Sequence, residues 1–352
     1  MEKSVKQKQK FRSVIIISLI GILVGLLFTG LAFGFDTARA IKGMTAGFII
    51  TFLIGIFENF VFQNKFRKLK FSTGLLIRTL VYVAVISFAV ISVWVIHESS
   101  VNDANIFSTL KSDDFRHFIV EGDFKSILLF AVVFSFLVNL SAQINNLLGK
   151  NVLLNYVTGK YHKPKEEERA FMFLDVSSST TIAEKLGPVA YHKLINSFFF
   201  DIDESIVGSE GEVYQYVGDE VVISWKNSRG FQNANCIRCF FNIQEKIGSL
   251  SEVYKKEFGL IPGFKAGLHC GQVIIGEIGD SKKEIVFHGD VLNTASRIQA
   301  ECNGLKKTFL VSEDILSKLK LPEEYLSESL GKFMLRGKAR EVKLFSIQKK
   351  TV

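Results

Sequence analysis

Long apolar stretches separated by short charged segments fill the first part of the chain. Two of the stretches carry no charged residue, and the other two are interrupted only by Glu58 and by Arg78; they cover residues 13–35, 43–62, 71–96 and 126–149. An α-helix needs ~20 apolar residues to cross the hydrocarbon core of a membrane. We therefore expect four transmembrane helices within residues 1–148. Glu58 and Arg78 are expected to snorkel or to pair with each other rather than to sense an ion.

Basic residues in the connecting segments predict the orientation of these helices. Several lysines and arginines precede the first stretch or lie between the second and third, whereas residues 97–123 hold only Lys111 and Arg116. Short loops rich in Lys and Arg stay cytoplasmic, so both termini should be cytoplasmic in a multi-pass protein of the inner (plasma) membrane. The first stretch exceeds the ~7–15 apolar residues of a signal peptide, and we expect no cleavage. The net charge of +8 then reflects topology and does not indicate nucleic-acid binding.

The segment after the fourth stretch changes from an apolar to a charged pattern. Residues 143–160 keep a helical pattern and predict a continuation of the fourth helix. Pro164 and the charged run at 165–169 then predict a break. We expect residues 149–168 to form a linker helix and a charged hinge, and residues 169–348 to form a second domain.

Short apolar runs alternate with helical patterns through this second domain. They predict a strand at 170–175, a helix at 180–207, a hairpin at 211–225, a long helix at 231–259 and a strand pair at 263–279. The first helix should break near Pro188, the hairpin should turn at Gly218 and Asp219, and the strand pair should turn at Gly271. Strand, helix, hairpin, helix and strand is the order of a ferredoxin-like α+β sandwich.

All four cysteines fall in the second domain, at Cys236, Cys239, Cys270 and Cys302. A cytoplasmic location would keep their thiols reduced. Cys236 and Cys239 have metal-ligand spacing, but they lie in a helical pattern and no second such pair accompanies them. We interpret them as core residues rather than zinc ligands.

Two carboxylates end up close together in the predicted sandwich. Asp175 ends the first strand, before SSST leads into a helix, and taken alone it could simply cap that helix. Asp219 taken alone could serve only the tight turn. If the first strand lies beside the hairpin, however, the two side chains converge. Two convergent carboxylates can hold two divalent cations for nucleotidyl transfer, and we favour that interpretation.

A third motif, HGDVLNTASRIQAECN at residues 288–303, opens with Gly-Asp and continues in a helical pattern. It places Asn293 and Arg297 one turn apart on the same helix face. Arginine suits charge that builds on phosphoryl oxygens, and asparagine can hold a ribose oxygen. The structural alternative for this pair is a solvated helix face.

The ordered set FLDVSSST, YVGDE, FKAGLHCG and HGDVLNTASR resembles the catalytic domain of class III nucleotidyl cyclases, the adenylate and guanylate cyclases, in a membrane-anchored bacterial form. The resemblance covers residues 169–347. It implies two divalent cations, Mg²⁺ or Mn²⁺, held by Asp175, Asp219 and the carbonyl of Val176. It implies that phosphate is bound by Lys265 and by the backbone N–H groups of Ser177, Ser178, Ser179 and Thr180. Asn293 would orient the ribose, and Arg297 would stabilise the transition state.

The chain departs from the family pattern at three positions. Gln215 stands where adenylate cyclases have an adenine-reading lysine and guanylate cyclases a glutamate. Its partner position is Val286, which makes no side-chain hydrogen bond. The late catalytic lysine aligns with Arg336, and Lys338 is close enough to replace it. The metal and ribose positions are kept, which favours an active enzyme, whereas the base-reading pair selects neither nucleotide.

The resemblance implies an adenylate cyclase that converts ATP to 3′,5′-cyclic AMP and pyrophosphate. In this family the metal residues and the Asn/Arg pair of one site come from different protomers, so one copy of each set implies a homodimer. The alternatives are a guanylate cyclase that uses GTP and a catalytically silent dimerisation module. A diguanylate cyclase is disfavoured, because YVGDEV lacks the first Gly and the final Phe of a GG[DE]EF turn.

Overall fold

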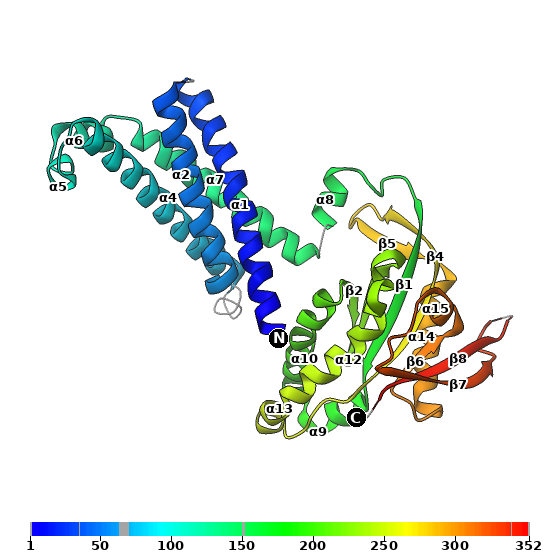
Figure 1. Cartoon of the computed structure of the whole chain (residues 1–352). Helices are drawn as coiled ribbons and strands as arrows, with labels where there is room; N and C mark the ends of the chain where they lie inside the picture. The colour runs from blue at the N-terminus through cyan, green and yellow to red at the C-terminus, as the bar shows by residue number, and fades with distance from the viewer. Residues whose placement is uncertain (1, 35, 63–69, 150–151, 339, 351–352) are drawn as a thin grey trace. The chain divides into compact units, whose positions relative to one another are not determined.

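The structure is a computed structural model that describes the chain except for residues 1, 35, 63–69, 150–151, 339 and 351–352 (Figure 1). The chain divides into two units, Met1–Leu147 and Leu148–Val352. Each unit has its own packing and is described separately.

The described residues of the first unit form helices joined by short turns and contain no strand. Its helices are α1 (Glu2–Phe33), α2 (Thr37–Ile56), the π-helical turn η1 (Phe57–Phe62), α4 (Phe71–Val101), α5 (Ile106–Thr109), α6 (Asp113–Val120) and α7 (Phe124–Leu148). Four segments are long and apolar enough to cross a membrane, namely Val14–Leu31, Thr37–Phe62, Phe71–Val101 and Phe124–Ile144. They correspond to the four apolar stretches predicted from the sequence.

Glycines allow α1 and α2 to pack in close contact. A Cβ atom placed on Gly25 would lie 2.0 Å from the carbonyl oxygen of Gly43, and one on Gly47 would lie 2.1 Å from that of Gly21. No side chain fits at such distances. Small residues at helix crossings let two backbones approach closely, which is a common basis of helix association in membranes.

The two charged residues of the apolar stretches lie together in this unit. Arg78 Nη1 is 3.6 Å from Glu58 Oε1, and the Tyr82 hydroxyl donates a hydrogen bond to the same carboxylate. The Arg78 guanidinium also lies over the ring of Phe62, 5.3 Å from its centroid. The prediction that Glu58 and Arg78 pair with each other is confirmed.

The second unit is built on one mixed sheet with the strand order β2-β3-β1-β4-β6-β8-β7, and β5 pairs with β4. The strands are β1 (Lys165–Val176), β2 (Glu212–Val217), β3 (Glu220–Lys226), β4 (Phe264–Ile278), β5 (Glu284–His288), β6 (Phe309–Ser312), β7 (Tyr325–Phe333) and β8 (Val342–Lys349). β1 is antiparallel to both β3 and β4, whereas β4 and β6 are parallel. Helices cover both faces of this sheet.

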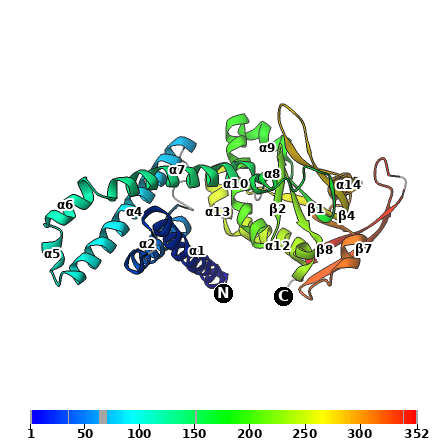
Figure 2. The same cartoon turned by 90° about the horizontal axis from the view of Figure 1, so that it is seen from above.

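Each face of β1 belongs to a different part of the core. Met172 and Leu174 are fully buried in the larger cluster, with Phe198 of α10 (Pro188–Gly208) and with α12 (Asn235–Ser249). Phe171 and Phe173 point to the opposite face and pack with Val291 of α14 (Asp290–Gly304). Figures 1 and 2 show α10 and α12 on one side of the sheet and α14 on the other. The predicted α+β class is confirmed.

The predicted turn at Gly271 is wrong, because β4 runs without interruption through this residue. β1 pairs with β4 along its whole length, from Lys165 opposite Ile275 to Val176 opposite Phe264. Gly271 serves close packing instead: a Cβ there would lie 2.8 Å from Cγ2 of Val291 on α14. The chain reverses later, between β4 and β5.

Two predicted helices are shorter than expected. The segment at 231–259 contains η2 (Gln232–Ala234), α12 and α13 (Ser251–Phe258), because Leu250 has non-helical backbone angles of −102° and 8°. The fourth long apolar helix ends at Leu148, and Gly149 has a φ of +98°. A short helix, α8 (Val152–Val157), follows. Residues 150–151 lie outside the described part of the chain.

The charged run after Pro164 is not a hinge. Lys165–Arg169 forms the first part of β1 and pairs with β4 between Gly271 and Ile275. Tyr161, just before it, is 3% exposed and packs in the same cluster as Phe171 and Phe173. The segment expected to separate the linker from the domain is therefore part of the sheet and of its core.

Candidate active site

Three neighbouring strands place one charged residue each in a row across the sheet. Asp175 of β1 lies opposite Glu220 of β3 on one side and opposite Lys265 of β4 on the other. Side chains alternate between the faces of a strand, so Asp175 shares the face of Phe173, which is the α14 face. Asp219 precedes Glu220 in the turn that joins β2 to β3. The predicted convergence of Asp175 and Asp219 is thus met by the fold.

The carboxyl groups of this row disfavour one another's charge. Burial, together with a hydrogen bond to Asp219 and the charge of Asp219, raises the pKa of Asp175, and Lys265 opposes this shift. Burial and the charges of Asp175 and Asp219 raise the pKa of Glu220 to about 7. Strongly perturbed pKa values that arise from burial and like charges are typical of functional sites.

Two further side chains hold Asp175 in place. Lys265 Nζ lies 3.3 Å from Asp175 Oδ2, and Gln299 Nε2 donates to the same oxygen at 3.1 Å. Lys265 also donates to Asn303 Oδ1 at 3.2 Å. Gln299 and Glu220 were not identified from the sequence. Gln299 lies on the buried face of α14, at helical spacing from Ala295 and Cys302. This spacing was the feature of the sequence that could have indicated that Gln299 faces the sheet.

The residues predicted to bind phosphate follow directly on β1. The Ser177 N–H donates to the Gly263 carbonyl at 2.9 Å, so this group already has a partner. Ser178 adopts the left-handed conformation, with a φ of +57°, and precedes α9 (Ser179–Leu186). Ser179 and Thr180 belong to the first turn of α9, where backbone N–H groups have no intrahelical acceptor and favour anions. The Val176 N–H approaches the Asp219 carbonyl at 3.4 Å, which ties the end of β1 to the hairpin turn.

The two residues assigned to base recognition lie on β2 and β5, which belong to the same sheet but do not pair with each other. Gln215 is exposed on β2, immediately after an irregularity in the pairing with β3 that skips Tyr214. Val286 is half-buried on β5. The Tyr214 hydroxyl accepts a hydrogen bond from the Phe287 N–H at 3.4 Å, and the two rings meet edge to face at 4.7 Å. Tyr214 links β2 to β5 and had no signal in the sequence.

The Asn293 and Arg297 pair lies on α14, toward its N-terminal half. Asn293 is exposed, and the Arg297 guanidinium reaches Gly337, where a Cβ would be 3.4 Å from Nη2. Lys338 forms an ion pair with Asp290 at the start of α14. Arg336 is exposed. The loop that carries both candidates for the late basic residue therefore packs beside Arg297, with Lys338 anchored to the helix.

The donor groups present fit divalent cations. Mg²⁺ and Mn²⁺ prefer oxygen ligands, and Mg²⁺ is commonly held by one or two carboxylates together with substrate phosphates. Asp175 and Asp219 supply two carboxylates whose repulsion a cation would relieve. Within the described residues, no group of three or more His, Cys, Asp or Glu side chains is arranged to hold a metal. The remaining ligands would then be backbone oxygens and the substrate.

The cysteines have the buried environment expected of core residues. Cys236 and Cys239 are fully buried on α12, and Cys270 and Cys302 are nearly so. Burial raises the pKa of all four thiols. Neutral thiols are poor metal ligands, which agrees with the packing interpretation.

The fold and these residues together define a class III cyclase catalytic domain, with four apolar helices N-terminal to it. Residues 161–349, more than half of the 352-residue chain, match the family described as "Adenylate and Guanylate cyclase catalytic domain". The chain belongs to this family.

Two curated relatives and one solved structure illustrate the similarity. Adenylate cyclase 2 of Rhizobium meliloti (strain 1021) is 33% identical over 222 residues, which are 63% of this chain and 61% of that protein. Adenylate cyclase 1 of the same organism is 23% identical over 188 residues, 51% of this chain and 27% of that protein. The chain thus matches less than two thirds of either relative. A bacterial light-regulated adenylyl cyclase shares the fold, with a TM-score of 0.54 at 19% identity, covering 64% of this chain and 66% of that one.

Proposed function

We propose that the protein is a membrane-bound adenylate cyclase that converts ATP to 3′,5′-cyclic AMP and pyrophosphate. The observation that carries this proposal is the convergence of Asp175 and Asp219 beside Lys265, at the point where β1 leads into α9. In the reaction the ribose 3′-oxygen loses its proton and bonds to the α-phosphorus. The bond between the α-phosphorus and the pyrophosphate oxygen breaks.

The chain's own residues would position the triphosphate and stabilise its charge. Asp175, Asp219 and the Val176 carbonyl would hold two divalent cations, which when bound lower the pKa of the 3′-hydroxyl and neutralise the leaving group. The N–H groups that open α9, around Ser179 and Thr180, would bind phosphate oxygens, as helix N-termini do. Lys265, 3.3 Å from Asp175, would bind the same phosphates as a point charge.

Residues of α14 and of the loop beside it would orient the ribose and stabilise the charge of the reacting phosphates. Asn293 would orient the ribose, and Arg297 would stabilise charge on the transferring phosphoryl group. Lys338 is already held by Asp290, so Arg336, which is exposed, would be the freer cation of this loop. We infer that these groups act on a nucleotide bound to the carboxylates of a second protomer, in a head-to-tail homodimer with two equivalent sites.

ATP is the proposed substrate, and GTP is the second candidate. The names of the curated relatives above support ATP. Gln215 can donate to adenine N1 through its amide NH₂ or accept from guanine through its amide oxygen, so its chemistry admits both bases. Val286 adds no polar group that would select either. Discrimination is expected to be modest, because strong selection requires buried polar groups that the wrong base leaves unpaired.

The four apolar helices would place the enzyme in the inner (plasma) membrane with the catalytic domain in the cytoplasm. This orientation rests on the basic residues that flank the first, second and third stretches. A silent dimerisation module is the competing function. It is disfavoured because both carboxylates expected to bind metal are retained and adjacent.

The full chain, purified in detergent, tests the proposal directly. With Mn²⁺ and ATP it should form cyclic AMP and pyrophosphate in equal amounts. Asp175→Asn and Asp219→Asn should each reduce kcat by at least ~100-fold, or ~2.7 kcal/mol of transition-state stabilisation at 1.36 kcal/mol per tenfold change. Asp280→Asn, in the exposed loop between β4 and β5, is the matched control. Turnover that survives in both site variants would refute the two-cation site, and no turnover with either nucleotide would favour the silent module.

A further inference from the structure

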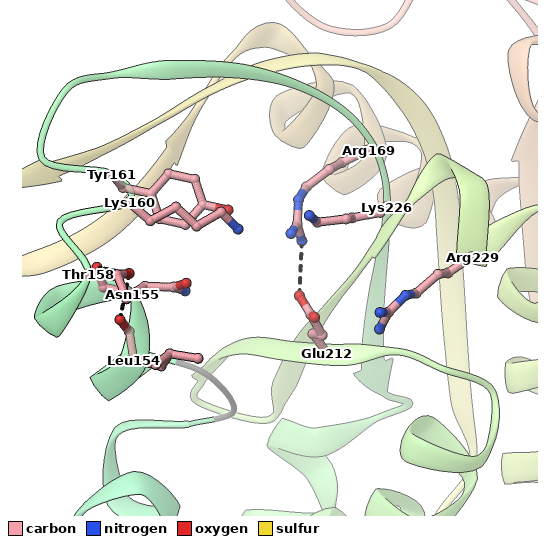
Figure 3. Close-up of a pocket in the computed structure, with 9 residues that line it drawn as sticks. All are labelled: Leu154, Asn155, Thr158, Lys160, Tyr161, Arg169, Glu212, Lys226 and Arg229. Carbon is pink, nitrogen blue, oxygen red and sulfur yellow. Dashed lines mark hydrogen bonds and ion pairs between the residues drawn. The ribbon is translucent and has the colours of Figure 1, made fainter.

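A cavity lies in the second unit at the opposite end of β1 from Asp175 (Figure 3). Its volume is about 290 Å³. The lining residues come from α8 and the turn after it, from the starts of β1 and β2, and from the end of β3 with the following α11 (Asn227–Gly230); they are Leu154, Asn155, Thr158, Lys160, Tyr161, Arg169, Glu212, Lys226 and Arg229. Four of these nine side chains are cationic, and only Glu212 is anionic.

Arg169 forms a fixed wall of this cavity. Its side chain is 4% exposed and donates to Glu167 at 3.0 Å, to Glu212 at 3.2 Å and to Ser224 at 3.0 Å. Its guanidinium also lies over the ring of Phe287 at 4.8 Å. All of these contacts hold the guanidinium in one orientation. Arg169 therefore contributes a positioned positive charge but few free hydrogen-bond donors.

Among the described residues, the carboxylates nearest to the other three cations lie at long distances. Lys160 and Lys226 lie 4.0 and 3.9 Å from the same oxygen of Glu167, and Arg229 lies 3.9 Å from Glu210. These distances exceed those of hydrogen bonds, so the ammonium and guanidinium groups keep donors for another acceptor. Figure 3 shows the nitrogen ends of Lys160, Lys226 and Arg229 directed toward the space between α8 and the sheet.

The carboxylate that two of these lysines share is already well satisfied. Tyr161 donates to Glu167 Oε1 at 2.8 Å, and Arg169 donates to its other oxygen. Burial raises the pKa of Glu167, but the bonds from Tyr161 and Arg169 and the charges of Arg169 and Lys226 outweigh it and lower the pKa. Both oxygens of Glu167 already accept a hydrogen bond, so the ammonium groups of Lys160 and Lys226 keep their donors for a ligand.

We propose that this cavity binds a small organic phosphate. Converging lysine and arginine donors suit phosphate oxygens, and Asn155 on α8 offers an amide beside them. A volume of about 290 Å³ exceeds that of the phosphate group alone and leaves room for a sugar-sized organic part beside Tyr161 and Leu154. The site is separate from the proposed active site and does not depend on it.

The position of the cavity connects it to the strands that carry Asp175 and Asp219. Arg169 and Asp175 lie six residues apart on β1, about 20 Å at ~3.3 Å per residue. Glu212 and Lys226 stand at the open end of the β2–β3 hairpin, and Asp219 is in its turn. A ligand in the cavity would contact the far ends of the strands that carry both carboxylates. It would also contact α8, the first helix after the last apolar segment.

Calorimetric titration of the full chain in detergent with ribose 5-phosphate and with inorganic phosphate tests the proposal. We expect one saturable site per chain, with tighter binding of ribose 5-phosphate. Lys226→Met with Arg229→Met should weaken this binding at least ~10-fold. Lys255→Met with Lys256→Met on α13 removes the same charge elsewhere and should leave binding within ~2-fold. Asp175→Asn should also leave binding unchanged, since a phosphate in the proposed active site would respond to that variant.

A gain-of-affinity variant excludes misfolding as the explanation. Glu210→Gln removes the carboxylate 3.9 Å from Arg229 and should tighten binding about 2-fold, the scale of an exposed ion pair. The absence of saturable binding up to ~10 mM, or equal affinity in the cavity variant and the α13 control, would overturn the proposal. Binding that changes with Asp175→Asn would assign the phosphate to the active site and overturn it equally.

Discussion

Glu220→Gln is expected to stabilise the second unit at neutral and alkaline pH. Glu220 lies opposite Asp175 in the register of β3 and β1 and follows Asp219 in the chain. Burial and these two charges raise its pKa to about 7 from an ordinary value of 4.5. Glutamine keeps the size and hydrogen-bonding ability of the side chain and removes the charge.

The raised pKa fixes the sign of the effect. Below pH 4.5 Glu220 is protonated in both the folded and the unfolded chain, so it does not lower the free energy of unfolding. Between pH 4.5 and 7 the folded state loses stability as the pH rises, and above pH 7 the loss is constant. The full difference would be about 3.5 kcal/mol at ~1.4 kcal/mol per pH unit. Because Glu220 is only partly buried, solvent screening reduces our expectation to ~1–2 kcal/mol.

Urea unfolding in detergent measures this difference. The chain has two tryptophans, and Trp225 is fully buried in the core of the second unit. In a Trp94→Phe background, fluorescence therefore reports that unit alone. Glu220→Gln should raise the free energy of unfolding by ~1–2 kcal/mol at pH 8 and leave it unchanged at pH 4.5. The exposed Glu184→Gln on α9 is the control. Equal stability at pH 8, or the same gain at both pH values, would refute the electrostatic argument.

Three further outcomes are expected. Mixing inactive Asp175→Ala and Arg297→Ala chains should restore about half of the activity per heterodimer, and failure in demonstrated heterodimers would place the whole site within one chain. Gln215→Glu should shift the ATP/GTP preference toward GTP in a competition assay, and an unchanged ratio would remove Gln215 from base recognition. Gly25→Leu should disrupt the close contact of α1 with Gly43 on α2 and lower the thermal stability of the first unit, measured by circular dichroism in detergent; an unchanged melting temperature would contradict the packing.

The length of the apolar runs was sufficient to predict the elements that consist of one such run. The four apolar stretches and the strand ending at Asp175 follow from it directly. The sequence pattern failed at Gly271, because a glycine in a strand indicates either a turn or a close approach, and only the position of Val291 on α14 decides between them. It failed again at Lys165–Arg169, where charged residues extend a strand whose first residues are largely exposed.

The chemistry of the site was predictable only where residues are fixed by a local motif. Asp175 and Asp219 each end a recognisable strand or turn, so their convergence followed from strand order. Glu220 and Gln299 reach the same site through cross-strand register and through the packing of α14, which are long-range features. Local sequence patterns do not show that residues 175 and 299 are close in space. The hydrogen bond between their side chains forms only when α14 packs on the assembled sheet.

The pairing of Lys265 bears on how the proposed reaction could begin. Its ammonium group lies 3.3 Å from Asp175 and donates to Asn303, so it partly neutralises the carboxylate it faces. On the proposed function the same group binds phosphate, and it cannot serve both partners fully. If cations bound by Asp175 and Asp219 neutralise the carboxylates, the electrostatic attraction between Lys265 and Asp175 becomes weaker. Cations bound to the carboxylates would release Lys265 for the triphosphate, and a triphosphate bound to Lys265 would release Asp175 for the cations. The binding of cations and the binding of triphosphate should then reinforce each other.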